Sequence, residues 1–188
     1  MAHPWHDVPF GDRVPEEFTS LIEIPKGSKV KYELDKETGL LLVDRVLYSS
    51  VIYPANYGFV PQTLGDDEDP LDVLVLMQEP VQPLSIVRAR PIGMMPMVDS
   101  GENDEKIICV HLDDPEYRSY EHHSELPEHR LVELKRFFQD YKKLENKEVR
   151  VGEFLDPEDA VEAVRHAMEL YEKHFAKMGQ TPQLKQQT

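Results

Sequence analysis

The sequence is poor in several features that mark secreted, membrane-spanning and nucleic-acid-binding proteins. Cysteine occurs once in 188 residues, as Cys109, so no disulfide can form within the chain, which suits a reducing compartment. Apolar runs are far shorter than the ~20 residues that cross a membrane. The N-terminus, MAHPWHDVPFGD, lacks the basic segment followed by an apolar one that marks a signal peptide. These absences predict a cytoplasmic protein with no membrane partner.

Basic residues are also scarce, with 21 Lys and Arg against 36 Asp and Glu and a formal net charge of −15. Proteins that bind nucleic acids or anionic membranes rely on basic side chains to neutralise phosphates, so this composition argues against both partners. An acidic protein can still bind an anionic substrate where Lys, Arg or bound metal ions gather locally. Hydrophobic residues make up 40% and charged residues 30%, which indicates a folded core rather than disorder.

Short β-rich runs, broken by Pro and Gly turns, occupy residues 19 to about 112. Their spacing of roughly ten residues is typical of a barrel or a sandwich. One more short strand is expected near the C-terminus, between two helices. The expected strands are Ser20–Ile24, Lys29–Leu34, Leu40–Arg45, Leu71–Met77, Ser85–Ile92, Lys106–His111 and Glu148–Phe154.

Two helices are expected after the main run of strands. The second begins with Asp156 as its N-cap and Pro157 at its first helical position, and Gly179 marks its end. Both carry apolar residues at the spacing of one helix face, which predicts that each packs against the strands. In the first helix this stripe is formed by Leu131, Leu134, Phe138 and Tyr141.

Strands followed by helices, without a linker or an internal repeat, predict an α+β fold in a single domain over residues 1–180. The fold is expected to be a small barrel with the two main C-terminal helices packed against it. Residues 1–18, rich in Pro, His and Asp, are expected to form an extended N-terminal arm. The polar residues 180–188 are expected to form a disordered tail.

The stretch DDEDPLD, residues 66–72, places five carboxylates directly before the apolar residues 73–77. Two like charges about 4 Å apart repel by roughly 4 kcal/mol at an effective dielectric near 20, so such crowding needs open water or neutralising cations. The strand that follows is apolar on both faces and therefore central, which puts Asp72 at the edge of the core and Asp67 and Asp69 on the loop before it. Carboxylates held by a rigid strand suit a hard cation such as Mg²⁺, although a solvated acidic loop remains the alternative.

A second acidic corner lies in MVDSGENDEK, where Asp99 and Asp104 flank a Gly turn and Lys106 begins the next strand. Two such corners in one small barrel could face each other and share metal ions. Two ions about 3.5–4 Å apart can clamp a phosphoryl group and lower the pKa of a bound water. The two corners together therefore favour a metal site more than either one alone.

Cationic side chains occur where an anionic substrate would need them. Strand alternation places Lys31 beside Glu33 on one face, able to take a phosphate and a metal-bound water. Arg45 ends the next expected strand, and an Arg fork suits phosphate oxygens. Taken singly, each is more typical of a surface salt bridge. Together with the two carboxylate corners they indicate a site for a polyphosphate.

Six segments in this order resemble one known family: IEIPKGSKVKYELDK, TGLLLVDR, YPANYGF, DDEDPLDVLVL, RPIGMMPMVDSGENDEK and FFQDYKKLE, from about residue 22 to residue 145. They are similar to the family I soluble inorganic pyrophosphatases, and the D-x-D-P-x-D element with its downstream D-x(4)-D-x-K partner is highly specific. The resemblance implies a five-stranded, OB-like β-barrel and Mg²⁺-dependent hydrolysis of pyrophosphate to two phosphates. It also implies three to four Mg²⁺ ions per site, with Mn²⁺ as a substitute, and a homo-oligomer.

The resemblance also implies roles for individual residues, carried over by motif position. Asp69 is expected to be the general base that acts on the attacking water. The expected metal-binding residues are Asp67, Asp72, Asp99 and Asp104, with Glu33 orienting a metal-bound water. The expected phosphate-contacting or pocket-closing residues are Lys31, Arg45, Tyr57, Lys106, Tyr141 and Lys142.

Two positions depart from the family pattern. The family commonly has Gly where this chain has Glu68, and often has Glu where this chain has Ser100. If the first position needs a positive φ, Glu68 costs about 1 kcal/mol. Neither change removes an expected ligand, so we expect activity to survive.

Two rival functions remain at this level. A metal-binding module without turnover would bind cations and release no phosphate. A phosphohydrolase for nucleotides or polyphosphate would need an aromatic platform for a base or room for a longer chain, and Tyr57 is the nearby candidate for stacking.

Overall fold

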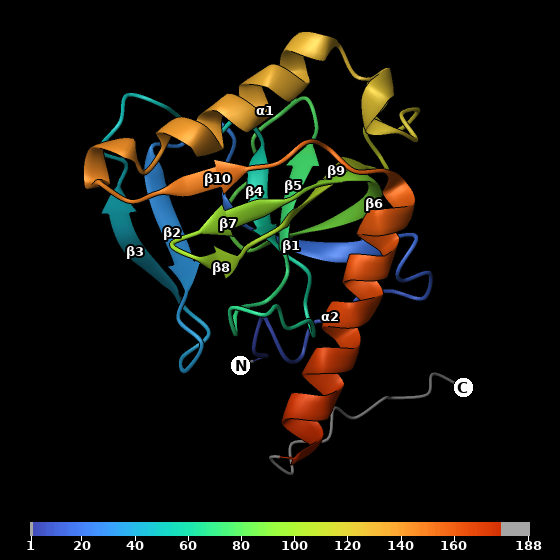
Figure 1. Ribbon diagram of the computed structural model, residues 1–188. Helices are drawn as coiled ribbons and strands as arrows, with labels where there is room; N and C mark the ends of the chain where they lie inside the picture. Colours follow the sequence, from blue (N-terminus) through green and yellow to red (C-terminus); the bar gives the residue numbers. More distant parts are fainter. Residues whose placement is uncertain (1, 178–188) are drawn as a thin grey trace.

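Five strands close into a barrel in the computed structural model, which describes residues 2–177 (Figure 1). Neighbouring strands pair antiparallel except β5 and β9, which are parallel. The expected α+β fold with a five-stranded, OB-like barrel is confirmed. In barrel order the strands are β1 (Phe18–Ile24), β4 (Asn56–Phe59), β5 (Asp72–Leu76), β9 (Lys106–His111) and β6 (Ser85–Met95).

Two smaller sheets and two long helices surround the barrel. The hairpin β2 (Val30–Leu34) and β3 (Leu41–Val46) projects from one side, and α1 crosses the top of the view while α2 runs down beside β6 (Figure 1). The other elements are β7 (Met97–Asp99), β8 (Glu102–Asn103), β10 (Val149–Val151), α1 (Glu128–Asp140), α2 (Pro157–Lys177) and the 3₁₀ helices η1 (His123–Glu125) and η2 (Lys143–Glu145).

Strand β4 was not expected, because Pro and Gly within YPANYGF are typical of turns. All four of its residues are buried, and Gly58 is needed where β4 crosses β1: a Cβ there would lie 1.8 Å from the carbonyl oxygen of Leu21. β6 continues three residues beyond Ile92, because a bulge between Pro91 and Gly93 absorbs the proline without ending the pairing.

Both expected helices are present. Pro157 begins α2 as predicted, and Asp159 Oδ2 accepts a hydrogen bond of 3.2 Å from the backbone N–H of Asp156. The predicted end at Gly179 and the predicted disordered tail at 180–188 lie outside the described residues. Between residues 2 and 177, neither helix is long and apolar enough to cross a membrane.

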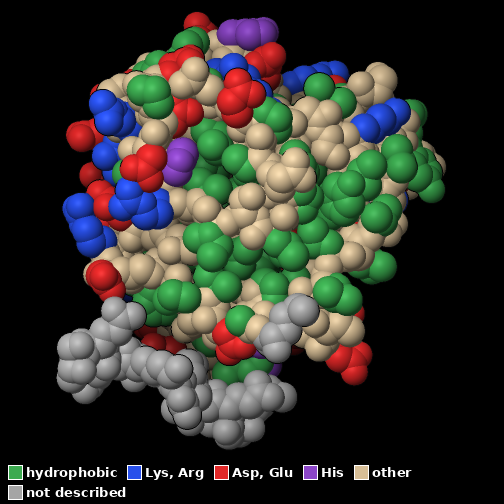
Figure 2. Space-filling view, turned by 180° about the vertical axis from the view of Figure 1, so that it is seen from behind, with side chains coloured by type: hydrophobic (Ala, Val, Ile, Leu, Met, Phe, Trp, Pro, Cys, Tyr) green, Lys and Arg blue, Asp and Glu red, His purple; other side chains and the backbone are tan. Residues whose placement is uncertain are grey.

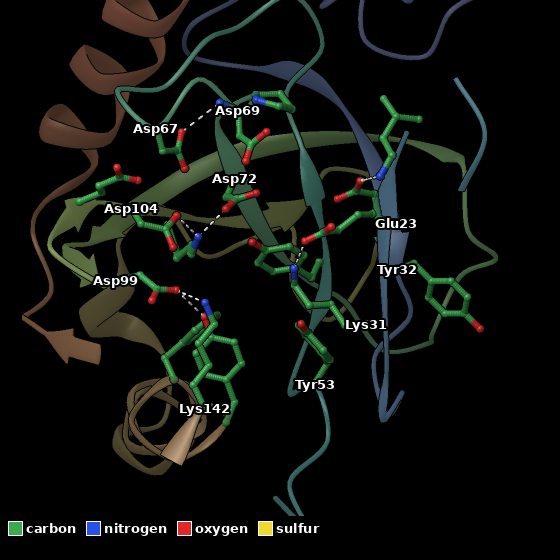
Figure 3. Close-up of a pocket in the computed structure, with 18 of the residues that line it drawn as sticks. Glu23, Lys31, Tyr32, Tyr53, Asp67, Asp69, Asp72, Asp99, Asp104 and Lys142 are labelled. Atoms are coloured by element: carbon green, nitrogen blue, oxygen red, sulfur yellow. Dashed lines mark hydrogen bonds and ion pairs between the residues drawn. The ribbon is translucent and has the colours of Figure 1, made fainter. Parts of the chain in front are cut away.

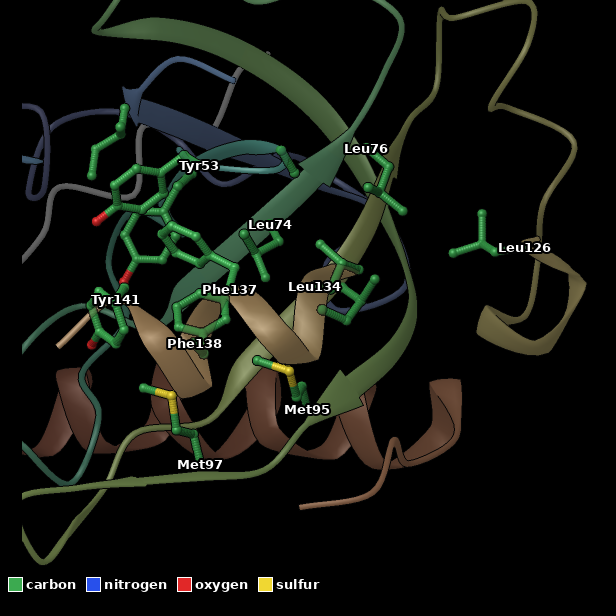
Figure 4. Packing of buried hydrophobic residues seen from close by; sticks show 14 of the residues in the cluster. Tyr53, Leu74, Leu76, Met95, Met97, Leu126, Leu134, Phe137, Phe138 and Tyr141 are labelled. Atoms are coloured by element: carbon green, nitrogen blue, oxygen red, sulfur yellow. The ribbon is translucent and has the colours of Figure 1, made fainter. Parts of the chain in front are cut away.

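The barrel is packed on two sides by the two helices. On one side α1 buries Leu134, Phe137 and Phe138 against the barrel (Figure 4). On the other, α2 buries the small residues Ala160 and Ala167, which let the helix approach the barrel closely. Fully burying one large apolar side chain contributes about 1.5–3 kcal/mol, so these contacts fix the position of the end of α1. That end leads into the site described below.

The segment 2–17 forms turns against the barrel instead of the expected extended arm. The cause is Trp5, whose side chain is 4% exposed and packs with Phe59, Tyr171 and Phe175. A buried indole of this size outweighs the local preference of Pro and Asp for an open chain.

Large hydrophobic side chains remain exposed on β3 and on the residues that flank it. Seen from behind, the molecule shows broad apolar areas, with many of the charged side chains along one edge and the top (Figure 2). Exposed apolar residues that gather on one surface are typical of an interaction site. Those between residues 40 and 52 are Leu40, Leu42, Val43, Val46, Tyr48 and Ile52.

Candidate active site

A pocket of about 500 Å³ lies where β5 and β9 begin (Figure 3). Acidic side chains line one side of it, and Lys31 and Glu23 lie across from them. Eleven of the twelve predicted site residues line this pocket, and Arg45 does not. The eleven are Lys31, Glu33, Tyr57, Asp67, Asp69, Asp72, Asp99, Asp104, Lys106, Tyr141 and Lys142.

The parallel pairing of β5 with β9 puts Asp72 next to Lys106, because each is the first residue of its strand and Val73 pairs with Ile107. The side chain of Lys106 is 2% exposed, and its ammonium forms ion pairs with both Asp72 and Asp104. Burial alone lowers the pKa of Lys106, but the two carboxylates raise it well above its ordinary value. This lysine therefore stays charged in the middle of the acidic cluster.

The carboxylates beside it are partly desolvated. Burial raises the pKa of Asp72 to about 6, although Lys106 opposes the shift. Burial also raises the pKa of Asp67, whose Oδ1 accepts a 3.1 Å hydrogen bond from the backbone N–H of Asp69. Burial thus disfavours the charged forms of these two acids. A cation bound between them would favour the charged forms.

The second acidic corner meets the end of α1. Lys142 forms an ion pair with Asp99, and the Tyr141 hydroxyl donates to Asp99 Oδ2 at 3.2 Å. Burial raises the pKa of Asp99, but the hydrogen bond and charge of Lys142 more than offset it and lower the pKa. Burial raises the pKa of Tyr141, so its phenol keeps its proton and remains a donor.

The β2–β3 hairpin supplies the next group of charges. Lys31 forms ion pairs with Glu33 and, at 3.2 Å, with Asp44. Arg45 lies opposite Lys31 in the hairpin, but its side chain binds Asp44 and, at 2.9 Å, Glu145, which draws it away from the pocket lining. Its Nη2 is buried and has no hydrogen-bond partner among residues 2–177.

Several residues of the lining were not among the predicted site residues. Glu23 interrupts the apolar run LIEI of β1, and this was the signal in the sequence that could have found it. Burial and then the charge of Asp72 raise the pKa of Glu23 to about 8, and Leu34 N–H donates to it at 2.6 Å. The others include Trp5, Tyr32, Lys36, Tyr53 and Glu102.

The raised pKa of Glu23 predicts a pH dependence of stability for the protein in chelator. In the folded protein Glu23 keeps its proton up to about pH 8, whereas in the unfolded chain it releases the proton above a pKa of about 4.5. The stability that Glu23 contributes is therefore fully present below about pH 4.5 and is lost as pH rises through about 8. Between pH 5 and pH 8.5 the unfolding free energy of the wild type should therefore fall more than that of Glu23→Gln, which has no carboxyl group to titrate. At about 1.4 kcal/mol per pKa unit, the difference should be a few kcal/mol. Urea unfolding at both pH values measures this.

Glu79→Gln, an exposed acid on the loop after β5, is the matched control and should follow the wild type. Equal losses for Glu23→Gln and the wild type would mean that Glu23 titrates normally in the folded protein.

The two departures from the family pattern both have left-handed backbone. Glu68 has φ 65° and Ser100 has φ 54°, so the position of Glu68 does require a positive φ. A non-Gly residue in this region costs about 1 kcal/mol or more. The side chain of Glu68 is exposed and offers no packing in return.

Glu68→Gly should raise the unfolding free energy by about 1 kcal/mol, because glycine adopts positive φ without strain. Urea or thermal unfolding measures the change. Glu68→Ala removes the same charge and keeps the strain, so the difference between the two variants isolates the backbone term. A glycine variant no more stable than the alanine variant would contradict the strain.

A separate group of potential ligands lies away from the pocket. Within residues 2–177, ligand atoms of His122, His123 and Asp156 fall within 4.8 Å of one another. His122 Nε2 already lies 3.1 Å from Asp156 Oδ1, and its Nδ1 accepts from the N–H of Ser124. Protein hydrogen bonds thus occupy both nitrogens of His122, and none of the three residues lines the pocket.

Comparisons with known proteins agree with the fold and identify the family. The family model for inorganic pyrophosphatase matches residues 20–172. The chain is 62% identical to soluble inorganic pyrophosphatase 1 of Arabidopsis thaliana, over 93% of this chain and 82% of that protein. It is 60% identical to soluble inorganic pyrophosphatase 2 of Chlamydomonas reinhardtii, over 93% and 91%.

Among solved structures, the inorganic pyrophosphatase of Thermus thermophilus superposes with a TM-score of 0.86 at 37% identity, covering 90% of this chain and 99% of that one. Both the matched sequence and the matched barrel extend over nearly the whole described chain. This protein therefore belongs to the family I soluble inorganic pyrophosphatases.

Proposed function

We propose that this inorganic pyrophosphatase is Mg²⁺-dependent and that the pocket where β5 and β9 begin is its active site. The observation that carries the proposal is the convergence of acidic and basic side chains from separate segments. Carboxylates from the loop before β5 and from the β7–β8 corner meet lysines of β2, β9 and the end of α1 in one pocket of about 500 Å³. In-line hydrolysis of a phosphoanhydride needs this combination of positioning and charge neutralisation.

The donor set fits a hard divalent cation. No Cys or His lines the pocket within the described chain, and its ligand atoms are carboxylate oxygens. Mg²⁺ prefers oxygen ligands, and Mn²⁺ accepts the same set. When bound, such ions lower the pKa of water and neutralise phosphate charge. The residues that would hold three to four ions are Asp67, Asp72, Asp99 and Asp104, with Glu33 beside them.

Basic and phenolic side chains are placed to bind the substrate. Lys31, Lys106 and Lys142 each lie beside carboxylates that a bound cation would engage, which leaves their ammonium groups for phosphate oxygens. Burial raises the pKa of Tyr57 and of Tyr141, so both phenols are hydrogen-bond donors at neutral pH. Charge-assisted hydrogen bonds of this kind orient pyrophosphate and withdraw charge from the leaving phosphate.

Asp69 suits the role of general base. It lies in the same lining as Asp67 and Asp72, but its side chain is 53% exposed, so water can reach its carboxylate. A base that takes a proton from the attacking water needs both access and a fixed position. Arg45 remains a proposed phosphate ligand through its buried Nη2, which has no partner in the described chain.

The experiment that tests the function is phosphate release from pyrophosphate by the purified protein. Three arms are needed: Mg²⁺, excess chelator, and Mg²⁺ with ATP in place of pyrophosphate. We expect fast release that requires Mg²⁺ and largely spares ATP. Metal binding without release would favour the binding-module function, and equal release from ATP would favour a broader phosphohydrolase.

The homo-oligomer implied by the resemblance and the cytoplasmic location predicted from the sequence composition stay predictions. The exposed apolar residues between positions 40 and 52 are a candidate interface for the homo-oligomer. Sedimentation equilibrium measures the assembly directly.

A further inference from the structure

The N-terminal segment 3–8 is bonded to the loop that carries the acidic residues of the pocket. Trp5 itself lines the pocket. Its indole N–H donates to the carbonyl of Thr63 at 2.8 Å, and its own carbonyl accepts from Gln62 N–H at 2.9 Å. The Thr63 hydroxyl in turn accepts from Leu71 N–H at 3.0 Å, so these bonds tie down both ends of the loop 63–71.

The same segment also contacts the turn between β2 and β3. His3 Nε2 lies 3.0 Å from the carbonyl oxygen of Lys36. A Cβ placed on Gly39 of that turn would lie 2.9 Å from Pro4 and 3.2 Å from His3, so the two segments are in close contact. The N-terminal segment therefore bridges two turns at the rim of the pocket.

Lys36 lies where these two turns meet. Its ammonium is 5.8 Å from the centre of the Trp5 ring, within the range of a cation–π contact. It donates to the Glu68 carbonyl at 3.0 Å and forms an ion pair with the carboxylate of Asp69. The residue whose carbonyl it binds, Glu68, is the one with the strained φ of 65°.

An exposed ion pair between a lysine and a carboxylate normally has no fixed geometry, because the long lysine side chain samples many rotamers. Here the indole face restricts the ammonium from one side and the Asp69 turn from the other. Lys29, directly before β2 of the same hairpin, is also exposed but has no side-chain partner among the described residues, so its ammonium is not held in this way.

We propose that Lys36 is a positioning residue for the catalytic turn: seated on Trp5, it holds the Glu68 peptide and the Asp69 carboxylate in the orientation that hydrolysis requires. The proposal rests on the proposed function of this pocket. A general base misplaced by about 1 Å loses much of its effect, so the contact acts on turnover and not on substrate binding.

The kinetic test compares Lys36→Met with Lys29→Met, which removes the same charge from the same hairpin. We expect Lys36→Met to lower kcat about tenfold with KM changed less than about twofold, as for a misplaced catalytic group. Lys36→Arg keeps the cation and should recover most of the loss. Equal kcat for Lys36→Met and Lys29→Met overturns the proposal, and so does a rise in KM alone, which would make Lys36 a substrate ligand.

The chain offers a second readout, since Trp5 is its only tryptophan. Mg²⁺ added to metal-free protein should change Trp5 emission in the wild type and in Lys29→Met, because Asp69 is two residues from a proposed ligand and is linked to the indole by Lys36. Lys36→Met should lose this response while its urea unfolding curve stays close to the wild type. An unchanged response in Lys36→Met overturns the link.

Variants of Trp5 complete the experiment. Trp5→Phe keeps an aromatic face for the ammonium and should retain most of kcat, whereas Trp5→Leu should resemble Lys36→Met. Equal kcat in the two Trp5 variants, with both folded, overturns the role of the ring. Should the wild type release no phosphate from pyrophosphate, the proposed function fails, and the emission response still decides separately whether Lys36 couples Trp5 to the acidic turn.

Discussion

Replacing Asp69 by Asn is expected to lower kcat by about 10²–10⁴-fold, the range associated with losing a general base. The amide has the same size and can still accept a hydrogen bond from Lys36, but it cannot take a proton from the attacking water. The loop keeps its shape, since the bond between Asp69 N–H and Asp67 Oδ1 uses the backbone of residue 69. Steady-state phosphate release at saturating Mg²⁺ measures the effect.

Asp66→Asn is the matched control for this variant. Asp66 belongs to the same loop and is exposed, but it does not line the pocket, so its loss changes the loop charge equally. We expect its turnover to stay within about twofold of the wild type, as for a surface substitution. Turnover near wild type in Asp69→Asn would remove Asp69 from the role of base, provided that urea unfolding shows both variants folded.

Strands with a regular apolar pattern were predictable from the sequence, but places where two distant backbones approach closely were not. Runs such as Val73–Leu76 are apolar on both faces and identify a central strand without any long-range knowledge. β4 has no such signal. Its Gly58 is required by the backbone of Leu21, 37 positions earlier in the chain, because a Cβ on residue 58 would lie 1.8 Å from the Leu21 carbonyl oxygen. A residue required by a distant backbone looks like a turn residue when the sequence is read locally.

The same distinction applies to the pocket. Asp67, Asp69 and Asp72 lie within one short motif, so their grouping could be read directly. Their meeting with Asp99 was a hypothesis from the two acidic corners, and their meeting with Lys142 was expected from the family resemblance alone. Both depend physically on the packing of α1 and β10.

Distant segments supply contacts that the sequence alone did not show. Arg45, a proposed phosphate ligand, binds Glu145, 100 residues further along the chain, through its Nε at 2.9 Å. Trp5 lies in a segment expected to be extended, and Lys36 lies in a polar turn that reads as solvent-exposed. Their link to Asp69 depends on the N-terminal segment packing between the β2–β3 turn and the turn that carries Asp69, which the sequence alone does not indicate.

Replacing Asp72 by Asn should raise the Mg²⁺ concentration needed for half-maximal activity by at least about 100-fold, more than the 10–100-fold typical of losing an outer partner of a metal ligand. Asp72 is anchored at the first position of β5 and is held beside Lys106, so no neighbouring carboxylate can take its place without moving a barrel strand. The pKa of about 6 that burial gives this group also means that protonation competes with the cation. Mg²⁺ dependence of the rate and calorimetric titration with Mg²⁺ measure the change independently.

Asp66→Asn again serves as the control, since it removes one negative charge from the same loop but changes no residue that lines the pocket. The removal of Asp72 leaves Lys106 paired with Asp104, so the buried ammonium keeps one partner and the barrel should still fold. At saturating Mg²⁺ the variant should regain much of its turnover, because Asp69 is intact. A low kcat with unchanged Mg²⁺ affinity would instead make Asp72 part of the chemical step, and an unchanged Mg²⁺ requirement with normal kcat would place the metal elsewhere in the pocket.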